Sequence, residues 1–120
     1  MDIYSQLSKA FAAHGFWKMW LIQAINTGET DLTVENARQD ERCGFGRWLQ
    51  SLPDDIKATV YWQKVPALHN RFHHDAAHVL ELALHGQRTD AMSEVAQDGG
   101  FTESSRALTH TIMDWKAALD

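Results

Sequence analysis

Apolar residues recur along most of the chain at intervals of three and four positions, which is the period of an amphipathic α-helix. No segment alternates apolar and polar residues convincingly, as a half-buried β-strand does. The pattern therefore predicts helices and no sheet. The predicted helical segments are residues 3–25, 43–51, 54–65, 66 to 84 or 85, 89–97 and about 102–119.

Glycine and proline mark the expected ends of these helices. Gly28 follows the first helix, and Pro53 ends the short helix that includes Cys43. Pro66 has no backbone N–H to donate, so we expect it to break or kink the preceding helix and to begin the next one. Helices joined by short loops pack as antiparallel neighbours. The sequence thus predicts an all-α fold over residues 1–120, a single four-helix-bundle-like domain with an extra short helix that carries the cysteine.

Composition narrows the classes of partner. The 120 residues are 44% hydrophobic and carry a formal net charge of -5, with acidic and basic residues interspersed. Such a surface argues against binding nucleic acid or an anionic membrane, because both favour a basic patch. The sequence predicts neither a signal peptide nor a membrane-spanning segment. A single cysteine forms no internal disulfide, so we expect a cytoplasmic protein.

The seven histidines fall on two kinds of helix face. An α-helix turns about 100° per residue, so His69 and His73 lie within about 40° of each other, in the middle of an apolar arc. His14 occupies the equivalent position in the first helix. The residues around His14 on that face are Leu7, Ala10, Phe11, Trp17, Leu21 and Ile25. These three histidines are therefore expected in the core.

The remaining histidines are expected to face solvent. His74, His78 and His85 form a second stripe on their helix, about 140° to 180° from the apolar arc. In the last helix, His110 lies opposite the predicted buried stripe. That stripe consists of Phe101, Leu108, Ile112, Trp115 and Leu119.

Three core imidazoles suggest a metal site. Each brings polar nitrogens that cost about 1–3 kcal/mol when buried without a partner, and one metal ion would satisfy all three. Cys43, in "DERCGFGRWLQSL", supplies a fourth ligand, and three imidazoles with one thiolate are typical of zinc. A shell of four protein ligands favours a structural or sensory site over a hydrolytic one. Spacing alone leaves open hydrogen-bonded core histidines and a small buried cysteine.

Three blocks of sequence occur in order: "HGFWKMWL" at 14–21, "CGFGRWL" at 43–49 and "HNRFH" at 69–73. In these blocks the chain resembles the CZB family, the chemoreceptor zinc-binding domains of bacteria. The resemblance implies an α-helical bundle, commonly a homodimer, that binds one Zn²⁺ per protomer through His14, Cys43, His69 and His73. It also implies sensing of zinc, or of oxidants through the zinc-bound cysteine, and control of a chemotaxis receptor or a diguanylate cyclase. No enzymatic activity is expected.

Several alternatives remain at this point. A hemerythrin-like di-iron oxygen carrier is also a histidine-rich bundle, but the apolar arc of His69 and His73 carries no carboxylate to bridge two irons. A zinc hydrolase would need an open coordination position and a general base. A purely structural zinc cannot be separated from a sensor by sequence. Phe16, Met19 and Trp20 lie off the core face of the first helix and predict a surface for self-association.

Overall fold

The fold is that of a computed structural model, which describes residues 2–30, 33–39 and 43–119. Every regular element in these ranges is a helix, so the predicted all-α class is confirmed. The helices are α1 (Ile3–Thr27), α2 (Val34–Arg38), α3 (Gly44–Ser51), α4 (Asp54–Lys57), α5 (Val60–Leu84), α6 (Arg88–Val95) and α7 (Gly100–Leu119).

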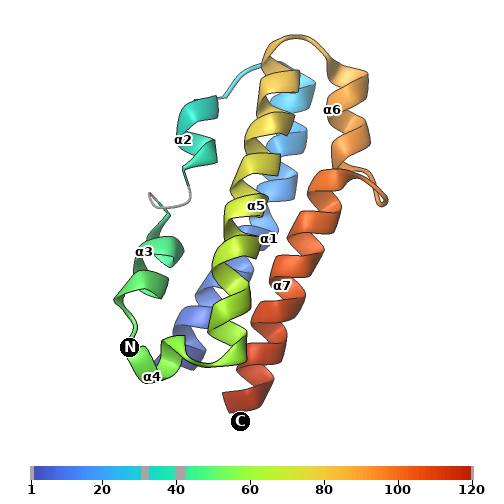
Figure 1. Cartoon of the computed structure of the whole chain (residues 1–120). Coiled ribbons are helices and arrows are strands. Elements are labelled where there is room, and N and C mark those ends of the chain that lie inside the picture. Colours follow the sequence, from blue (N-terminus) through green and yellow to red (C-terminus); the bar gives the residue numbers. More distant parts are fainter. Residues whose placement is uncertain (1, 31–32, 40–42, 120) are drawn as a thin grey trace.

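Three long helices, α1, α5 and α7, run side by side, while α2 and α3 form a broken column along one flank of α5 (Figure 1). Helix α6 lies above α7, beside the upper end of the bundle. Helix α5 is central, because it contacts each of the other helices. This arrangement brings segments from the first, second and fourth quarters of the chain against one helix.

Local signals set the ends of α1 much as the sequence predicts. The carboxylate of Asp2 accepts a hydrogen bond from the backbone N–H of Ser5, at 2.7 Å, and so caps the first turn. Gly28 ends the helix with a φ of 72°, a left-handed conformation that glycine adopts without steric cost. A side-chain cap of this kind stabilises a helix by about 1 kcal/mol.

The predicted helix boundary at Pro66 is wrong, because α5 is one helix of 25 residues that runs through this proline. The helix begins at a stronger signal, Thr59, whose hydroxyl accepts a hydrogen bond from the N–H of Trp62 at 3.3 Å. The first two turns are held further by the Trp62 indole, which donates to the carbonyl of Leu49 at 2.9 Å, and by fully buried Val65. A proline inside a helix costs about 3 kcal/mol, and this tertiary packing offsets it.

Buried side chains of the long helices form one continuous core, to which the short helices add a few residues. Helix α2, which the hydrophobic pattern does not predict, buries Ala37 completely. Two predicted core residues lie nearer the surface, since Phe11 is 38% exposed and Leu119 is 44% exposed. Phe11 is on the outer margin of α1, and Leu119 is in the last turn of α7. No helix in the described ranges is both long enough and apolar enough to span a bilayer.

Candidate metal centre

Four potential ligands from three separate segments meet inside the bundle. His14 comes from α1, Cys43 directly precedes α3, and His69 and His73 lie one turn apart on α5. Their donor atoms all lie within 4.8 Å of one another. The three histidines are only 2%, 1% and 3% exposed, and Cys43 is half-buried. The structure therefore brings together the four residues that the sequence singles out.

The distances suit a single tetrahedral ion. The Nε2 atoms of His69 and His73 are 3.0 Å apart, and the sulfur of Cys43 is 3.9 Å from Nε2 of His14. Zn–N bonds of about 2.0–2.1 Å and a Zn–S bond of about 2.3 Å separate tetrahedral ligand atoms by about 3.3–3.6 Å. These two pairs bracket that range, so changes of a few tenths of an ångström would bring each of them to it.

Backbone carbonyls orient two of the imidazoles. Nδ1 of His14 donates a hydrogen bond to the carbonyl of Ala10 at 2.7 Å, and Nδ1 of His73 donates to the carbonyl of Ala37 at 3.0 Å. A carbonyl only accepts, so the proton of each neutral ring is on Nδ1 and the lone pair is on Nε2, which faces the cluster. Such outer hydrogen bonds are the usual support of metal-binding histidines.

Aromatic rings enclose the imidazoles. Phe45 lies 5.5 Å from His14 and 5.2 Å from His69 between ring centroids, and Phe72 lies 5.0 Å from His14. Trp17 lies edge-on to His73, with centroids 5.3 Å apart. These apolar rings exclude water from one side of the cluster, which strengthens electrostatic interactions within it.

Burial also keeps two of the imidazoles neutral, those of His14 and His69. It lowers the pKa of His14 to about 4, although the carbonyl of Ala10 partly opposes the shift, and His73 adds a smaller lowering. The pKa of His69 is lowered to about 3 by burial and then by the neighbouring His73 and His14. Both rings are therefore uncharged near pH 7, with one ring nitrogen free of a proton, which is the form in which imidazole binds a metal.

A hollow on the surface leads to the sulfur side of the cluster. It has a volume of about 340 Å³ and reaches both His14 and Cys43. Its outer walls come from one face of α1. The residues that line it are Gln6, Lys9, Ala10, Ala13, His14, Cys43, Gly44 and Phe45. Small solutes can thus approach Cys43 from this side, whereas the imidazoles of α5 lie deeper.

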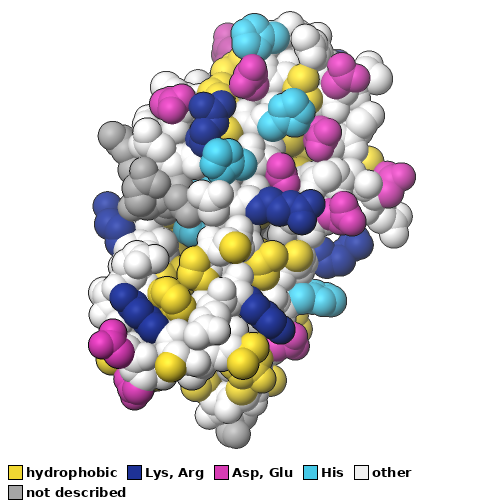
Figure 2. All heavy atoms as spheres, viewed as in Figure 1, with side chains coloured by type: hydrophobic (Ala, Val, Ile, Leu, Met, Phe, Trp, Pro, Cys, Tyr) yellow, Lys and Arg dark blue, Asp and Glu magenta, His cyan; other side chains and the backbone are white. Residues whose placement is uncertain are grey.

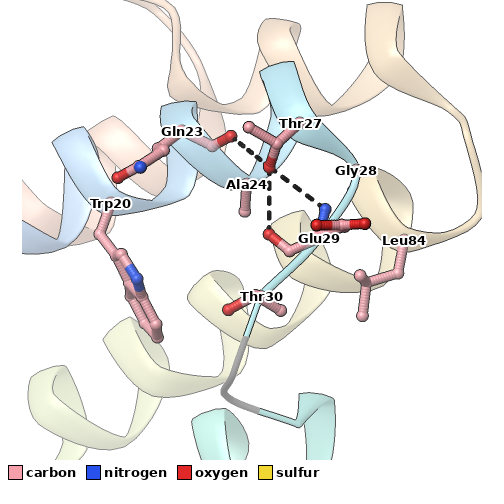
Figure 3. Close-up of a pocket in the computed structure, with 8 residues that line it drawn as sticks. All are labelled: Trp20, Gln23, Ala24, Thr27, Gly28, Glu29, Thr30 and Leu84. Carbon is pink, nitrogen blue, oxygen red and sulfur yellow. Dashed lines mark hydrogen bonds between the residues drawn. The ribbon is translucent and has the colours of Figure 1, made fainter.

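A larger hollow lies at the far end of α1 and has no part in the cluster (Figure 3). Trp20 and Leu84 face it from opposite sides, and the polar groups at its rim bond to one another. The hydroxyl of Thr27 donates to the carbonyls of Gln23 and Glu29, at 3.0 and 3.2 Å. Its oxygen also accepts from the N–H of Glu29 at 3.3 Å. These bonds close the end of the helix.

The other histidines are exposed, as predicted: His74, His78, His85 and His110. Among the described residues, the donor cluster contains no carboxylate, and His110 points away from it. These observations oppose a di-iron centre, which needs bridging carboxylates. Sequence reasoning missed the carbonyl of Ala37 on α2, because every residue has a carbonyl and nothing in the side-chain pattern distinguishes this one.

Comparison with known proteins gives one family. The family model described as the chemoreceptor zinc-binding domain matches residues 14–80, more than half of the chain. The matched stretch begins at His14 and contains Cys43, His69 and His73. No curated protein and no solved structure matches the chain.

Proposed function

Because the chain belongs to the chemoreceptor zinc-binding domain family, we propose that His14, Cys43, His69 and His73 are the ligands of its zinc ion. We further propose that residues 1–120 act as one sensory domain, which reports zinc or oxidants to a signalling partner. The observation that carries the proposal is the convergence of four donor atoms within 4.8 Å in the core. The family is a zinc-binding one, and this cluster is able to hold a metal.

The donor set accounts for a regulatory role without catalysis. Three imidazoles and one thiolate fill a tetrahedral shell and leave no position for a reactive water. When bound, zinc would hold Cys43 as a thiolate and would link three segments of the chain. The carbonyls of Ala10 and Ala37 keep Nε2 of His14 and His73 directed inward.

Cys43 is the residue at which the proposed signal begins. The hollow beside α1 gives a two-electron oxidant, such as hypochlorous acid or a peroxide, access to its sulfur. With a peroxide, the sulfur would attack oxygen, an S–O bond would form, and the O–O bond would break with hydroxide leaving. With hypochlorous acid, the sulfur would attack chlorine, the O–Cl bond would break with hydroxide leaving, and water would then replace chloride on the sulfur. The resulting sulfenic acid is a weaker ligand, so the start of α3 would be released from the cluster.

A line of aromatic rings connects this segment to α7. Phe45 stacks on Trp48 with centroids 5.8 Å apart, and Trp48 lies 6.3 Å from Trp115. Trp115 is in the last part of α7, so movement of α3 changes the packing of that helix. This contact supports α7 as the route to the partner, which we expect to be a chemotaxis receptor or a diguanylate cyclase.

We expect the domain to act as a cytoplasmic homodimer. The support is an apolar patch on α1, where Phe16 is 67% exposed and Met19 is 70% exposed, with half-buried Trp20 beside them. A patch of this kind favours contact with a second copy, which would cover it. Sedimentation of the wild type against Phe16→Asp tests this part separately.

Metal analysis of purified variants tests the proposed ligands. Cys43→Ala and His73→Ala should lose zinc or bind it much more weakly, while the exposed neighbour His78→Ala should keep one equivalent. A mild oxidant should then release zinc from the wild type. If His78→Ala loses that zinc as His73→Ala does, the ligand assignment is wrong. If zinc stays bound after Cys43 is oxidised, the metal is structural and the oxidant-sensing proposal fails.

A further inference from the structure

A stripe of exposed histidines follows the outer face of α5, opposite the buried cluster. His74 and His78 are separated by four positions, and Glu81 and His85 continue the stripe. At about 100° per residue these four side chains lie within an arc of about 60°. Figure 2 shows histidine side chains along the upper half of this face, with acidic side chains beside them.

The geometry points to a second metal site: we propose that His74 and His78 together bind a divalent transition metal such as Zn²⁺ on the surface of α5. Histidines at positions i and i+4 of a helix present two imidazole nitrogens to one ion. Imidazole suits zinc, copper and nickel. Neither residue belongs to the buried cluster, so the second site is independent of it.

The backbone under this pair is rigid, which favours binding. His74 and His78 lie in the second half of the 25-residue helix α5, at least six residues from its end at Leu84. The neighbouring residues His73, Ala77 and Val79 are buried, so this part of the helix is packed against the core. A preorganised pair of ligands loses little conformational entropy on binding.

The charges around the pair favour a cation. Glu81 lies one turn beyond His78, and its carboxylate is only loosely paired with Arg38, at 3.8 Å. On the other side, Arg71 is directed at Asp75, with Nε and the carboxylate oxygen 3.6 Å apart. Both guanidinium groups are thus turned toward carboxylates, Arg38 most closely toward Glu35 at 3.0 Å, and Glu81 places a negative charge one turn from His78.

The outer site should be the weaker of the two. Two exposed imidazoles leave most of the coordination shell to water, whereas the buried cluster offers four protein ligands. The domain would therefore take up a second equivalent of zinc only after the first is bound.

Calorimetric titration of the chain loaded with one equivalent of zinc tests the proposal, with Zn²⁺ as the titrant. The wild type should bind a further equivalent, and His74→Ala and His78→Ala should each weaken it about tenfold or more, a loss of about 1.4 kcal/mol. His85→Ala and His110→Ala are matched controls. His85 is exposed on the same stripe but lies about 10 Å beyond His78 along the helix axis.

Both control variants should bind the second equivalent as the wild type does, and all four variants should retain the first. The proposal is overturned if the wild type binds no further zinc. It is equally overturned if His85→Ala or His110→Ala weakens binding as much as the pair variants do, because the metal is then held by scattered surface histidines.

Discussion

His73 and His74 are adjacent in sequence but lie on different faces of α5, about 100° apart, one buried and one exposed, and this contrast gives a sharp test of the buried cluster. We compare His73→Ala with His74→Ala, which removes the same atoms from an exposed position. In the absence of metal, His73→Ala leaves the buried carbonyl of Ala37 without its donor, at a cost of about 1–3 kcal/mol. The cavity left by the ring adds about 2–5 kcal/mol.

In the wild type, burial of the His73 ring nitrogens costs free energy, and the alanine variant no longer has this cost. The gain offsets part of the destabilisation from the lost hydrogen bond and the cavity. We therefore expect His73→Ala to lower the free energy of unfolding by about 2–4 kcal/mol in the presence of a chelator. An exposed substitution such as His74→Ala should stay within about 0.5 kcal/mol of the wild type. With one equivalent of zinc the difference should widen. A variant that binds 100-fold more weakly loses up to about 2.7 kcal/mol of metal-linked stability.

Urea unfolding, followed by circular dichroism, measures the free energy of unfolding of each variant, once with a chelator and once with one equivalent of zinc. The chelator series isolates the packing and hydrogen-bond term, and the difference between the two series isolates the metal term. Equal stability of His73→Ala and His74→Ala in both series would refute the reasoning about this face. A difference in the chelator series alone would show that His73 is a core residue and not a ligand.

Three further predictions follow from the described contacts. The free energy of unfolding of the metal-free protein should fall by a few kcal/mol as the pH falls from about 6.5 toward 4. The pKa values of His14 and His69 are lowered in the folded state, so over this pH range the unfolded state binds protons that the folded state does not; acid titration in the presence of a chelator measures the loss. Ser104→Ala should lower the free energy of unfolding by about 1–3 kcal/mol, because the hydroxyl donates to Asp75 between α7 and α5; urea unfolding measures the change. Ala13→Leu should narrow the hollow and slow the reaction of Cys43 with peroxide, while zinc content is unchanged; a thiol assay over time measures the rate.

The buried cluster was predictable because helix periodicity places side chains on faces, and three polar residues on apolar faces stand out. His14, His69 and His73 could be identified in this way, and Cys43 stood out as the only cysteine. The predicted helix boundary at Pro66 was wrong, because the loss of one backbone N–H at the proline was outweighed by packing and by the cap at Thr59.

Helix α2 shows why other features could not be predicted. It has only five residues, too few for a hydrophobic period to emerge, and it is held by tertiary contacts with α5. Its contribution to the cluster is the carbonyl of Ala37, a backbone group that carries no sequence signal. The hollow that leads to Cys43 is likewise formed by the packing of α1 against the start of α3, and it exists only in the folded chain.

The edge-on contact between Trp17 and His73 means that the protein contains its own optical reporter. An indole this close to an imidazole changes its emission when the charge or ligation of that ring changes. We therefore expect uptake and release of metal to change the ultraviolet fluorescence of the unlabelled protein, which a stopped-flow instrument follows on the millisecond timescale. Trp17→Phe would silence this signal while leaving the four donor atoms in place.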